Sequence, residues 1–249
     1  MTNFVQLFKN MLSDSSERVA LIDSSTDREV SYAELTTRVN EIHQLLLLQK
    51  VGEGEDVSIV SNNHIDQVAS IIAVLQYGAK INGVDLSSER IQSEIQRIEG
   101  VQGNLSRQVI VMVSASSSKT EILIAALLCG AQVVMMPENI SDDAFFQKVK
   151  KIRPHIISMN CTFAEEIIRN SIYPSINNAK MSHVMSLSHT RRMVYKQVRK
   201  HLMSCLGGCV QNLTVYGTSP LSTDVERFLH RIDFPYRFIS SHTPLAASV

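Results

Sequence analysis

"IIAVLQYGAKINGVDLSSERI" (Ile71–Ile91) and "LIAALLCGAQVVMMPENISDD" (Leu123–Asp143) follow one plan. In each, an apolar helix ends at a Gly-Ala pair, a β-rich run follows, and serine begins the next helix. Glycine readily supplies the left-handed residue that ends a helix, and the small alanine lets the returning strand pack closely. The repetition therefore predicts two related α/β lobes, residues 1–105 and 106–249.

Strands and helices alternate along the whole chain, which indicates an α/β fold with mostly parallel sheets flanked by helices. The expected strands are Val57–Asn62, Ala79–Asp85, Gln108–Ala115, Ala131–Pro137, His155–Asn160, Gln211–Gly217 and Phe234–Ser240. The expected helices are Ser31–Leu48, Asp66–Gly78, Ser87–Gly100, Lys119–Gly130, Ser141–Ile152, Thr190–Gly208 and one within Thr218–Ile232. A surface loop is expected at Ser171–His183.

The helix predicted at Ser31–Leu48 begins with a capping box. In this motif Ser31 accepts a hydrogen bond from the backbone N–H of Glu34, whose carboxylate reaches back to the N–H of Ser31. Apolar residues at helical spacing then predict one face turned towards a core. They are Leu35, Val39, Ile42, Leu45 and Leu46.

The composition indicates a cytoplasmic protein. The 249 residues include 24 basic and 24 acidic side chains, so the zero net charge gives no preference for nucleic acid or anionic membranes. The start of the chain has no signal-peptide pattern, and the longest apolar run, Ile122–Met136, is too short to span a bilayer. Four cysteines without a C-x-x-C pair fit a reducing compartment.

Several stretches resemble, in order, the N-terminal domain of the adenylate-forming (AMP-binding) enzymes, and among these the long-chain fatty acid–CoA ligases most. They are "ALIDSSTDREVSYAEL" (20–35), "GEGEDVSIVSNN" (52–63) with "AVLQYGAKINGVD" (73–85), "LIAALLCGAQVVMMPE" (123–138) and "LGGCVQNLTVYGTSPLSTDVERFLHRIDFPYRF" (206–238). The resemblance implies that a carboxylate reacts with ATP and that the acyl group then passes to a thiol.

The same resemblance implies the ligands and the site. An active member would use ATP and Mg²⁺, an acyl or other carboxylate substrate, and CoA or a carrier thiol. The residues matching the family's adenine side are Gly217, Thr218, Ser219, Pro220 and Thr243. Neither a catalytic residue nor a metal ligand is assigned.

Four departures from the family pattern predict impaired adenylation, or a need for a partner. Only a short stretch around Gly103–Arg107 stands where the family has its phosphate loop. Pro244 stands where a glutamate holds Mg²⁺, and proline offers no carboxylate to a hard cation. Ser240 replaces the family's aromatic residue, and the sequence ends at Val249, before a C-terminal domain. The alternative is a non-catalytic binding or scaffold module that kept the fold.

Two other motifs have simpler interpretations. "VSASSSKTEILIA" (Val113–Ala125) resembles a phosphate-binding loop but lacks its glycines. Helix capping by Ser117 or Ser118 is favoured there, with residual anion binding left open. His201, Cys205 and Cys209 are four residues apart, yet the Gly-Gly pair before Cys209 breaks the helix. Buried thiols are therefore favoured over a metal site, which needs four ligands.

Three surface features leave alternatives open. The basic residues Arg192, Lys196, Arg199 and Lys200 favour a solvated helix face over a phosphate or headgroup contact. The polar cluster Asn62, Asn63, His64 and Asp66 follows a predicted strand, where α/β folds bind ligands, but a helix cap explains it equally well. Apolar surface left where a C-terminal part would dock predicts a protein partner or a homo-oligomer.

Overall fold

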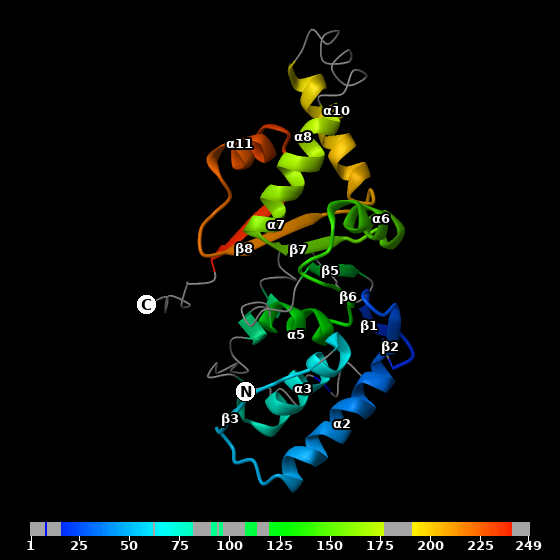
Figure 1. Ribbon diagram of the computed structural model, residues 1–249, viewed down its shortest axis with the longest axis vertical. Helices are drawn as coiled ribbons and strands as arrows, with labels where there is room; N and C mark the ends of the chain where they lie inside the picture. The colour runs from blue at the N-terminus through cyan, green and yellow to red at the C-terminus, as the bar shows by residue number, and fades with distance from the viewer. Residues whose placement is uncertain are drawn as a thin grey trace. The chain divides into compact units, whose positions relative to one another are not determined.

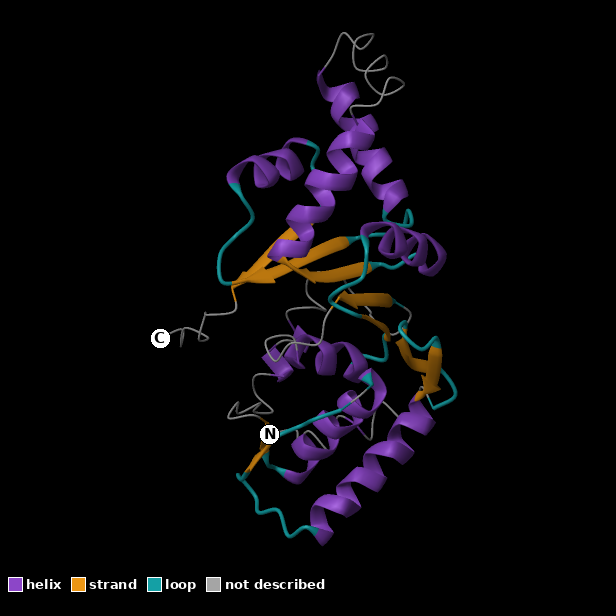
Figure 2. Ribbon diagram, in the orientation of Figure 1, coloured by secondary structure: helices purple, strands orange, loops and turns teal. Residues whose placement is uncertain are grey.

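The computed structural model describes residues 8, 16–61, 63–81, 91–93, 95–96, 108–113, 120–176 and 191–240 (Figure 1). The chain divides into two compact units, which are considered separately. Unit 1 comprises residues 1–110 and 115–137, and unit 2 comprises residues 111–114 and 138–249. Strands and helices alternate in both, as Figure 2 shows, so the predicted α/β class is confirmed.

Unit 1 has a sheet in which β2, β1 and β6 are neighbours in that order, and β5 follows β6 in the sheet but is divided between the units, with Val109 and Ile110 in unit 1 and residues 111–113 in unit 2. Strand β1 pairs antiparallel with β2 and parallel with β6, with Leu21 opposite Val133. A separate two-stranded parallel sheet joins β3 and β4. The strands and helices are β1 (Val19–Asp23), β2 (Arg28–Ser31), α2 (Tyr32–Leu48), β3 (Asp56–Val57), α3 (His64–Tyr77), β4 (Lys80–Ile81), β5 (Val109–Val113), α5 (Thr120–Leu128) and β6 (Gln132–Met136).

Local sequence signals fix the ends of the helices in unit 1. The predicted capping box at the start of α2 is present, with Ser31 and Glu34 bonded reciprocally. Helix α3 begins at the N-cap Asn63 and ends at Gly78, whose φ is 81°. Tyr32 is fully buried, and its hydroxyl donates to the carbonyl oxygens of Leu127 (3.0 Å) and Ala131 (2.7 Å). Tyr32 therefore ties α2 to the end of α5.

Unit 2 has parallel strands β7, β8 and β9 side by side. Ile156 lies opposite Asn212, and Leu213 lies opposite Tyr236. The elements are α6 (Asp142–Ile152), β7 (Ile156–Asn160), α7 (Cys161–Glu166), the π-helix η3 (Ile167–Ile172), α8 (Tyr173–Ile176), α10 (Arg191–Cys205), β8 (Asn212–Gly217), α11 (Thr223–Arg231) and β9 (Tyr236–Ser240).

The compact units differ from the lobes predicted from the repeat. Helix α5 and strand β6 belong to the second copy of the repeat, yet both lie in unit 1 rather than with residues 138–249. The cause is tertiary, because β6 pairs with β1 and the Tyr32 hydroxyl bonds to the carbonyls that end α5. The two copies of the sequence repeat therefore do not correspond to the two compact units.

Three local predictions need correction. The strand expected at Val57–Asn62 is confined to Asp56–Val57, and Val60 is 92% exposed. Ser171–Ile176, expected in a loop, is helical, and the Tyr173 ring packs edge-on against Phe228 at 5.1 Å. On α2, Leu45 is 55% exposed rather than buried. The helix predicted at Ser87–Gly100 lies largely outside the described residues.

Candidate functional site

The predicted adenine-side residues Gly217–Pro220 form the turn after β8. This turn lies at the carboxyl end of the parallel strands of unit 2, and Thr218, Ser219 and Pro220 are exposed. Ligands of α/β proteins commonly bind at such strand ends. Thr243, the fifth predicted residue, and Pro244 lie outside the described residues, so the structure brings together four of the five positions.

The turn packs closely against the start of α7. A Cβ atom on Gly217 would lie 3.0 Å from the Cys161 Sγ, so a side chain at this position would require the cysteine to shift by a few tenths of an ångström. The Cys161 thiol also donates to the Ser219 carbonyl oxygen at 3.0 Å. Burial, with the nearby Glu165 carboxylate, raises the pKa of the Cys161 thiol to about 11. The thiol is therefore protonated at neutral pH and acts as a structural contact, not as a nucleophile.

A polar network fixes the end of the turn where α11 begins. The backbone N–H of Ser222 donates to the Glu165 carboxylate. The Arg169 guanidinium donates to the Ser222 Oγ and the Asp224 Oδ1, both at 2.8 Å. The hydrogen bond from Arg169 holds the pKa of Asp224 below its ordinary value. The turn is thus braced by α7 and η3 while its tip stays open.

Two tyrosines hold the neighbouring strands. The Tyr216 hydroxyl donates to the Val113 carbonyl oxygen at 2.7 Å, and the Tyr236 hydroxyl donates to the Glu226 Oε1 at 2.6 Å. Burial is the largest cause that raises the pKa of each hydroxyl above its ordinary value. Both hydroxyls therefore stay neutral and support the carboxyl edge of the sheet.

Among the described residues, no group of three or more His, Cys, Asp or Glu side chains is arranged to hold an ion. The His201 Nε2 lies 3.7 Å from the Cys205 Sγ, while the Cys209 Sγ accepts from Arg153. Two other predicted features, the serine-rich loop at 114–119 and the stretch at 103–107, lie outside the described residues.

The cluster at the start of α3 is a helix cap joined to a buried carboxylate. Asn63 accepts from the Asp66 backbone N–H at 2.7 Å, which confirms the capping interpretation. The ring of His64 contacts the Asp23 Oδ1 through Nδ1 at 3.1 Å. Asp23 is fully buried at the end of β1, and no motif in the sequence assigned it a role. The sequence signal that could have indicated Asp23 is its position directly before Ser24 and Ser25, because the side chain of an aspartate in a turn often accepts hydrogen bonds from nearby backbone N–H groups.

Hydrogen bonds decide the charge of Asp23. Burial alone would raise its pKa, but bonds from the Ser25 hydroxyl and N–H and from His64 outweigh burial and lower the pKa to about 2. The carboxylate is therefore ionised at neutral pH. It anchors the N-terminus of α3 to β1.

The helices in the described part of the chain lack the combined length and apolarity that a membrane span requires. The order and pairing of the described strands and helices make this an α/β protein with parallel strands, helices on their faces, and an open turn at the carboxyl edge of unit 2.

Comparisons with known proteins agree with this class. Residues 8–98 match the family model described as AMP-binding enzyme. A curated relative, 3-oxocholest-4-en-26-oate–CoA ligase of Rhodococcus rhodochrous, is 34% identical over 96 residues. That match covers 39% of this chain and 17% of the relative, so the chain matches less than a fifth of the relative's length.

Solved structures share the fold over nearly the whole chain. The N-terminal domain of FACL13 from Mycobacterium tuberculosis matches with a TM-score of 0.68 at 8% identity, covering 96% of this chain and 75% of that one. The amide bond synthetase McbA from Marinactinospora thermotolerans matches with a TM-score of 0.67 at 10% identity, covering 94% and 59%. Residues 8–98 are thus similar to AMP-binding enzymes, and the chain has the fold of the N-terminal domains of adenylate-forming enzymes.

Proposed function

We propose that the chain is an acyl-CoA-synthetase-like protein, related to the fatty acid–CoA ligases, that binds an acyl-adenylate in the cytoplasm. The Gly217–Pro220 turn carries this proposal. Its tip is exposed at the carboxyl end of β8, and its base is fixed by Cys161 and Glu165. A braced, open turn lets backbone groups meet a ligand without a large ordering cost.

The proposal separates binding from complete catalysis. Arg169 is already engaged by Ser222 and Asp224, and the described residues include no group of three or more His, Cys, Asp or Glu side chains that could hold an ion. Pro244 occupies the position of the family's Mg²⁺-binding glutamate in the sequence. We therefore expect adenylate binding that does not depend on Mg²⁺, and ATP-dependent acyl transfer to a thiol only when a partner supplies the missing groups.

Calorimetric titration with a non-hydrolysable acyl-adenylate analogue, with and without Mg²⁺, tests the proposal. The expected result is micromolar binding in both conditions. Ser219→Trp should weaken the binding at least tenfold, since the large ring fills the exposed turn. Gln197→Trp, at an exposed position on α10, is the matched control and should leave the affinity unchanged.

The same titration separates the proposal from the alternative of a scaffold module that kept the fold and binds no adenylate. Absence of binding at millimolar analogue would refute the ligase-like proposal and favour that alternative. Equal weakening by Ser219→Trp and Gln197→Trp would show that the ligand lies elsewhere.

A further inference from the structure

The zero net charge of the chain conceals a separation of charge between its units. Unit 1 contains 10 Lys and Arg against 16 Asp and Glu, a formal charge of −6. Unit 2 contains 14 Lys and Arg against 8 Asp and Glu, a formal charge of +6. Fields of opposite sign steer complementary surfaces together. Each unit therefore carries the charge that would attract the other unit of a second copy.

The positive charge of unit 2 is concentrated on α10, shown in yellow in Figure 1. This helix has five cationic residues and no acidic one. Arg192, Lys196 and Lys200 are spaced four residues apart, so they form one row on the helix surface, and all three are exposed. Within the described residues none of the three has a carboxylate partner, whereas Arg199 pairs with Asp233 at 2.6 Å. We call these three residues the cationic row.

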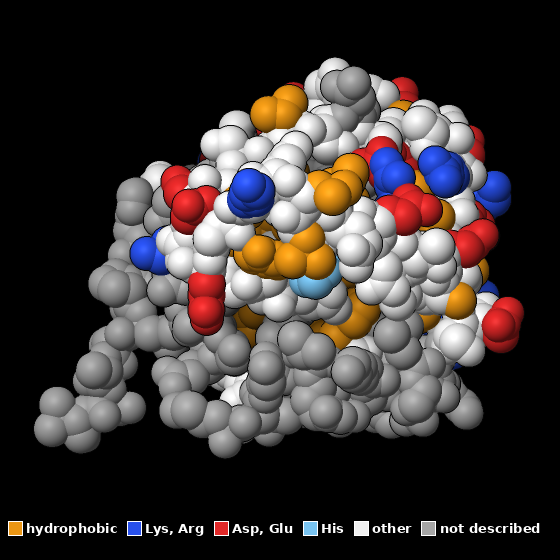
Figure 3. All heavy atoms as spheres, turned by 90° about the horizontal axis from the view of Figure 1, so that it is seen from below, with side chains coloured by type: hydrophobic (Ala, Val, Ile, Leu, Met, Phe, Trp, Pro, Cys, Tyr) orange, Lys and Arg blue, Asp and Glu red, His pale blue; other side chains and the backbone are white. Residues whose placement is uncertain are grey.

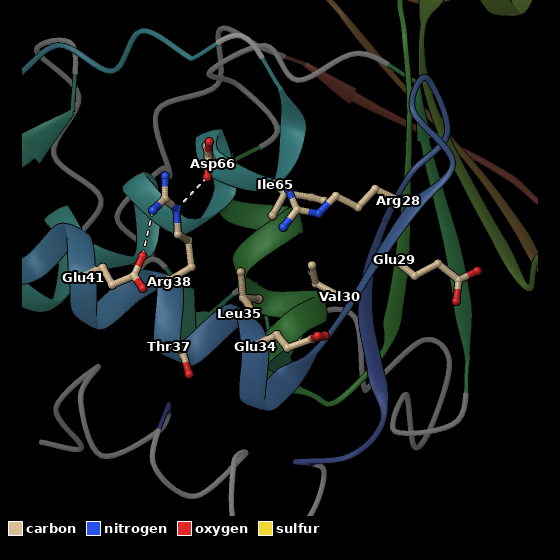
Figure 4. Close-up of a pocket in the computed structure, with 10 residues that line it drawn as sticks. All are labelled: Arg28, Glu29, Val30, Glu34, Leu35, Thr37, Arg38, Glu41, Ile65 and Asp66. Atoms are coloured by element: carbon tan, nitrogen blue, oxygen red, sulfur yellow. Dashed lines mark hydrogen bonds and ion pairs between the residues drawn. The ribbon is translucent and has the colours of Figure 1, made fainter.

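Unit 1 contains a groove of about 510 Å³ between β2, α2 and the start of α3 (Figure 4). Three buried apolar side chains lie along it: Val30, Leu35 and Ile65. The charged side chains that line it are Arg28, Glu29, Glu34, Arg38, Glu41 and Asp66. Four carboxylates against two guanidinium groups give the groove a formal charge of −2.

The carboxylates of the groove are not fully neutralised. Arg38 forms ion pairs with two of these carboxylates, as Figure 4 shows. Its Nη1 lies 2.7 Å from Glu41 and its Nε lies 2.7 Å from Asp66. The Glu34 carboxylate accepts instead from the neutral Ser31 N–H and hydroxyl. Acceptor capacity therefore remains for an arriving cation.

We propose that the cationic row of one copy docks into this groove of a second copy, a head-to-tail contact. A Lys or Arg side chain can lay its apolar stem over apolar surface while its charged end meets the carboxylates. Because the copies are neutral overall, no net repulsion opposes their approach. Each copy offers both surfaces, so the contact is heterologous and continues unless rotation closes a ring. The inference does not depend on adenylate binding.

A competing contact would use apolar surface instead. Leu45, Leu47 and Leu48 at the end of α2 are exposed, as is Val60. Figure 3 shows hydrophobic side chains gathered near the centre of one face, with acidic and basic side chains around them. Association through such a patch would persist in high salt, whereas the proposed contact would be screened. Ionic strength separates the two.

Sedimentation velocity of the full chain over a range of concentrations gives the first test. At an ionic strength of about 0.01 M, where the Debye length is roughly 30 Å, we expect concentration-dependent association. At about 1 M, where it is roughly 3 Å, we expect monomers. Monomers in both conditions, or association that is unchanged at high salt, would overturn the proposal.

Charge reversal gives the second test. One variant reverses the cationic row (Arg192→Glu, Lys196→Glu, Lys200→Glu), and the other reverses the groove (Glu29→Lys, Glu41→Lys). All five side chains are exposed, so both variants should keep the wild-type far-UV circular dichroism. Each variant alone should be monomeric at low salt. A mixture should associate with 1:1 stoichiometry, because the first keeps an acidic groove for the cationic row of the second and the two reversed surfaces are also complementary.

A control variant tests whether loss of association is specific to the cationic row. Lys151→Glu with Arg227→Glu reverses two exposed cations of unit 2 outside α10 and should associate like the wild type. Failure of the mixture to form a complex, or wild-type association of the row-reversed variant, would refute the pairing of these two surfaces. Replacing Arg192, Lys196 and Lys200 with Gln removes the charge of the cationic row without reversing it. This variant should also fail to associate, with a smaller change in net charge.

Discussion

The two Gly-Ala turns share a backbone conformation and differ in their surroundings. The N–H of Gly78 bonds to the Leu75 carbonyl and that of Ala79 to Val74. At the second turn, Gly130 bonds to Leu127 and Ala131 to Ala126, the same pattern. The φ angles of the glycines are 81° and 75°. These bonds form the Schellman motif, which satisfies carbonyls at a helix end.

Beyond the turns the two regions diverge. The first is followed by the two-residue strand β4, whose partner is the equally short β3. The second is followed by β6, five residues long and paired with β1 inside a larger sheet. A local pattern therefore fixes where a helix ends, while the partner strands decide how far the next strand extends. Substitutions at and around the two turns can measure how strongly each turn depends on its surroundings.

The largest effect is expected at Tyr32, which supports only the second turn. Replacing this fully buried side chain in Tyr32→Ala should lower the free energy of unfolding by about 3–5 kcal/mol, because a large cavity forms and two carbonyls lose a donor. Tyr32→Phe removes only the hydroxyl and should cost about 1–3 kcal/mol. Urea denaturation followed by circular dichroism measures both.

The first turn provides the control for this comparison. Tyr77, the last residue of α3, is half-buried, and its ring lies 5.5 Å from that of His43. Tyr77→Phe keeps this packing, and we expect a change within about 0.5 kcal/mol. Equal losses from Tyr32→Phe and Tyr77→Phe would contradict the greater dependence of the second turn on tertiary bonds.

A smaller effect, with a pH signature, is expected at Asp23. This residue bonds to the start of α3, while the next N–H along, that of Ser24, donates to Met135 in β6. Lowering its pKa from 3.8 to about 2 corresponds to about 2 kcal/mol of stability. Because the folded-state pKa is depressed, this stability is present above pH 3.8 and is lost as the pH falls towards 2.

Asp23→Asn should therefore cost about 2 kcal/mol at pH 7 and show a shallower loss of stability between about pH 4 and pH 2. Denaturant titrations across that range provide the measurement. Asp27→Asn is the matched control, since Asp27 is exposed in the same hairpin and asparagine accepts its φ of 50°. If the two variants have parallel pH profiles, the stabilising role of Asp23 is wrong.

These contrasts explain which features the sequence could reveal. The Ser31 capping box and the Gly78 helix end lie within a few residues of their partners, so a pattern along the chain predicts them. Asp23 and His64 are 41 residues apart, and the contact between Gly217 and Cys161 joins separate elements. Periodicity carries no information on such contacts. The family resemblance pointed to the Gly217 turn, but not to the close contact of this turn with Cys161.

The smallest effect is expected from placing a methyl group at the glycines themselves. Both have positive φ, so Gly78→Ala and Gly130→Ala should each cost about 1–2 kcal/mol. At the exposed Gly78, the added Cβ would meet the Cγ of Glu53 at 3.2 Å, and this flexible side chain can move. Gly130 is buried, and its carbonyl accepts from Arg18 at 2.9 Å, so a shift there also disturbs that bond.

We therefore expect Gly130→Ala to cost more than Gly78→Ala, with the difference measured by thermal or urea unfolding. Gly78→Asn should recover part of the loss, because asparagine tolerates the left-handed conformation. The reverse order, or a neutral Gly78→Ala, would mean that the shared Schellman backbone is not what both turns require. A larger loss in the free energy of unfolding at Gly130 would instead show that the contribution of this motif to stability depends on the strands and side chains around it.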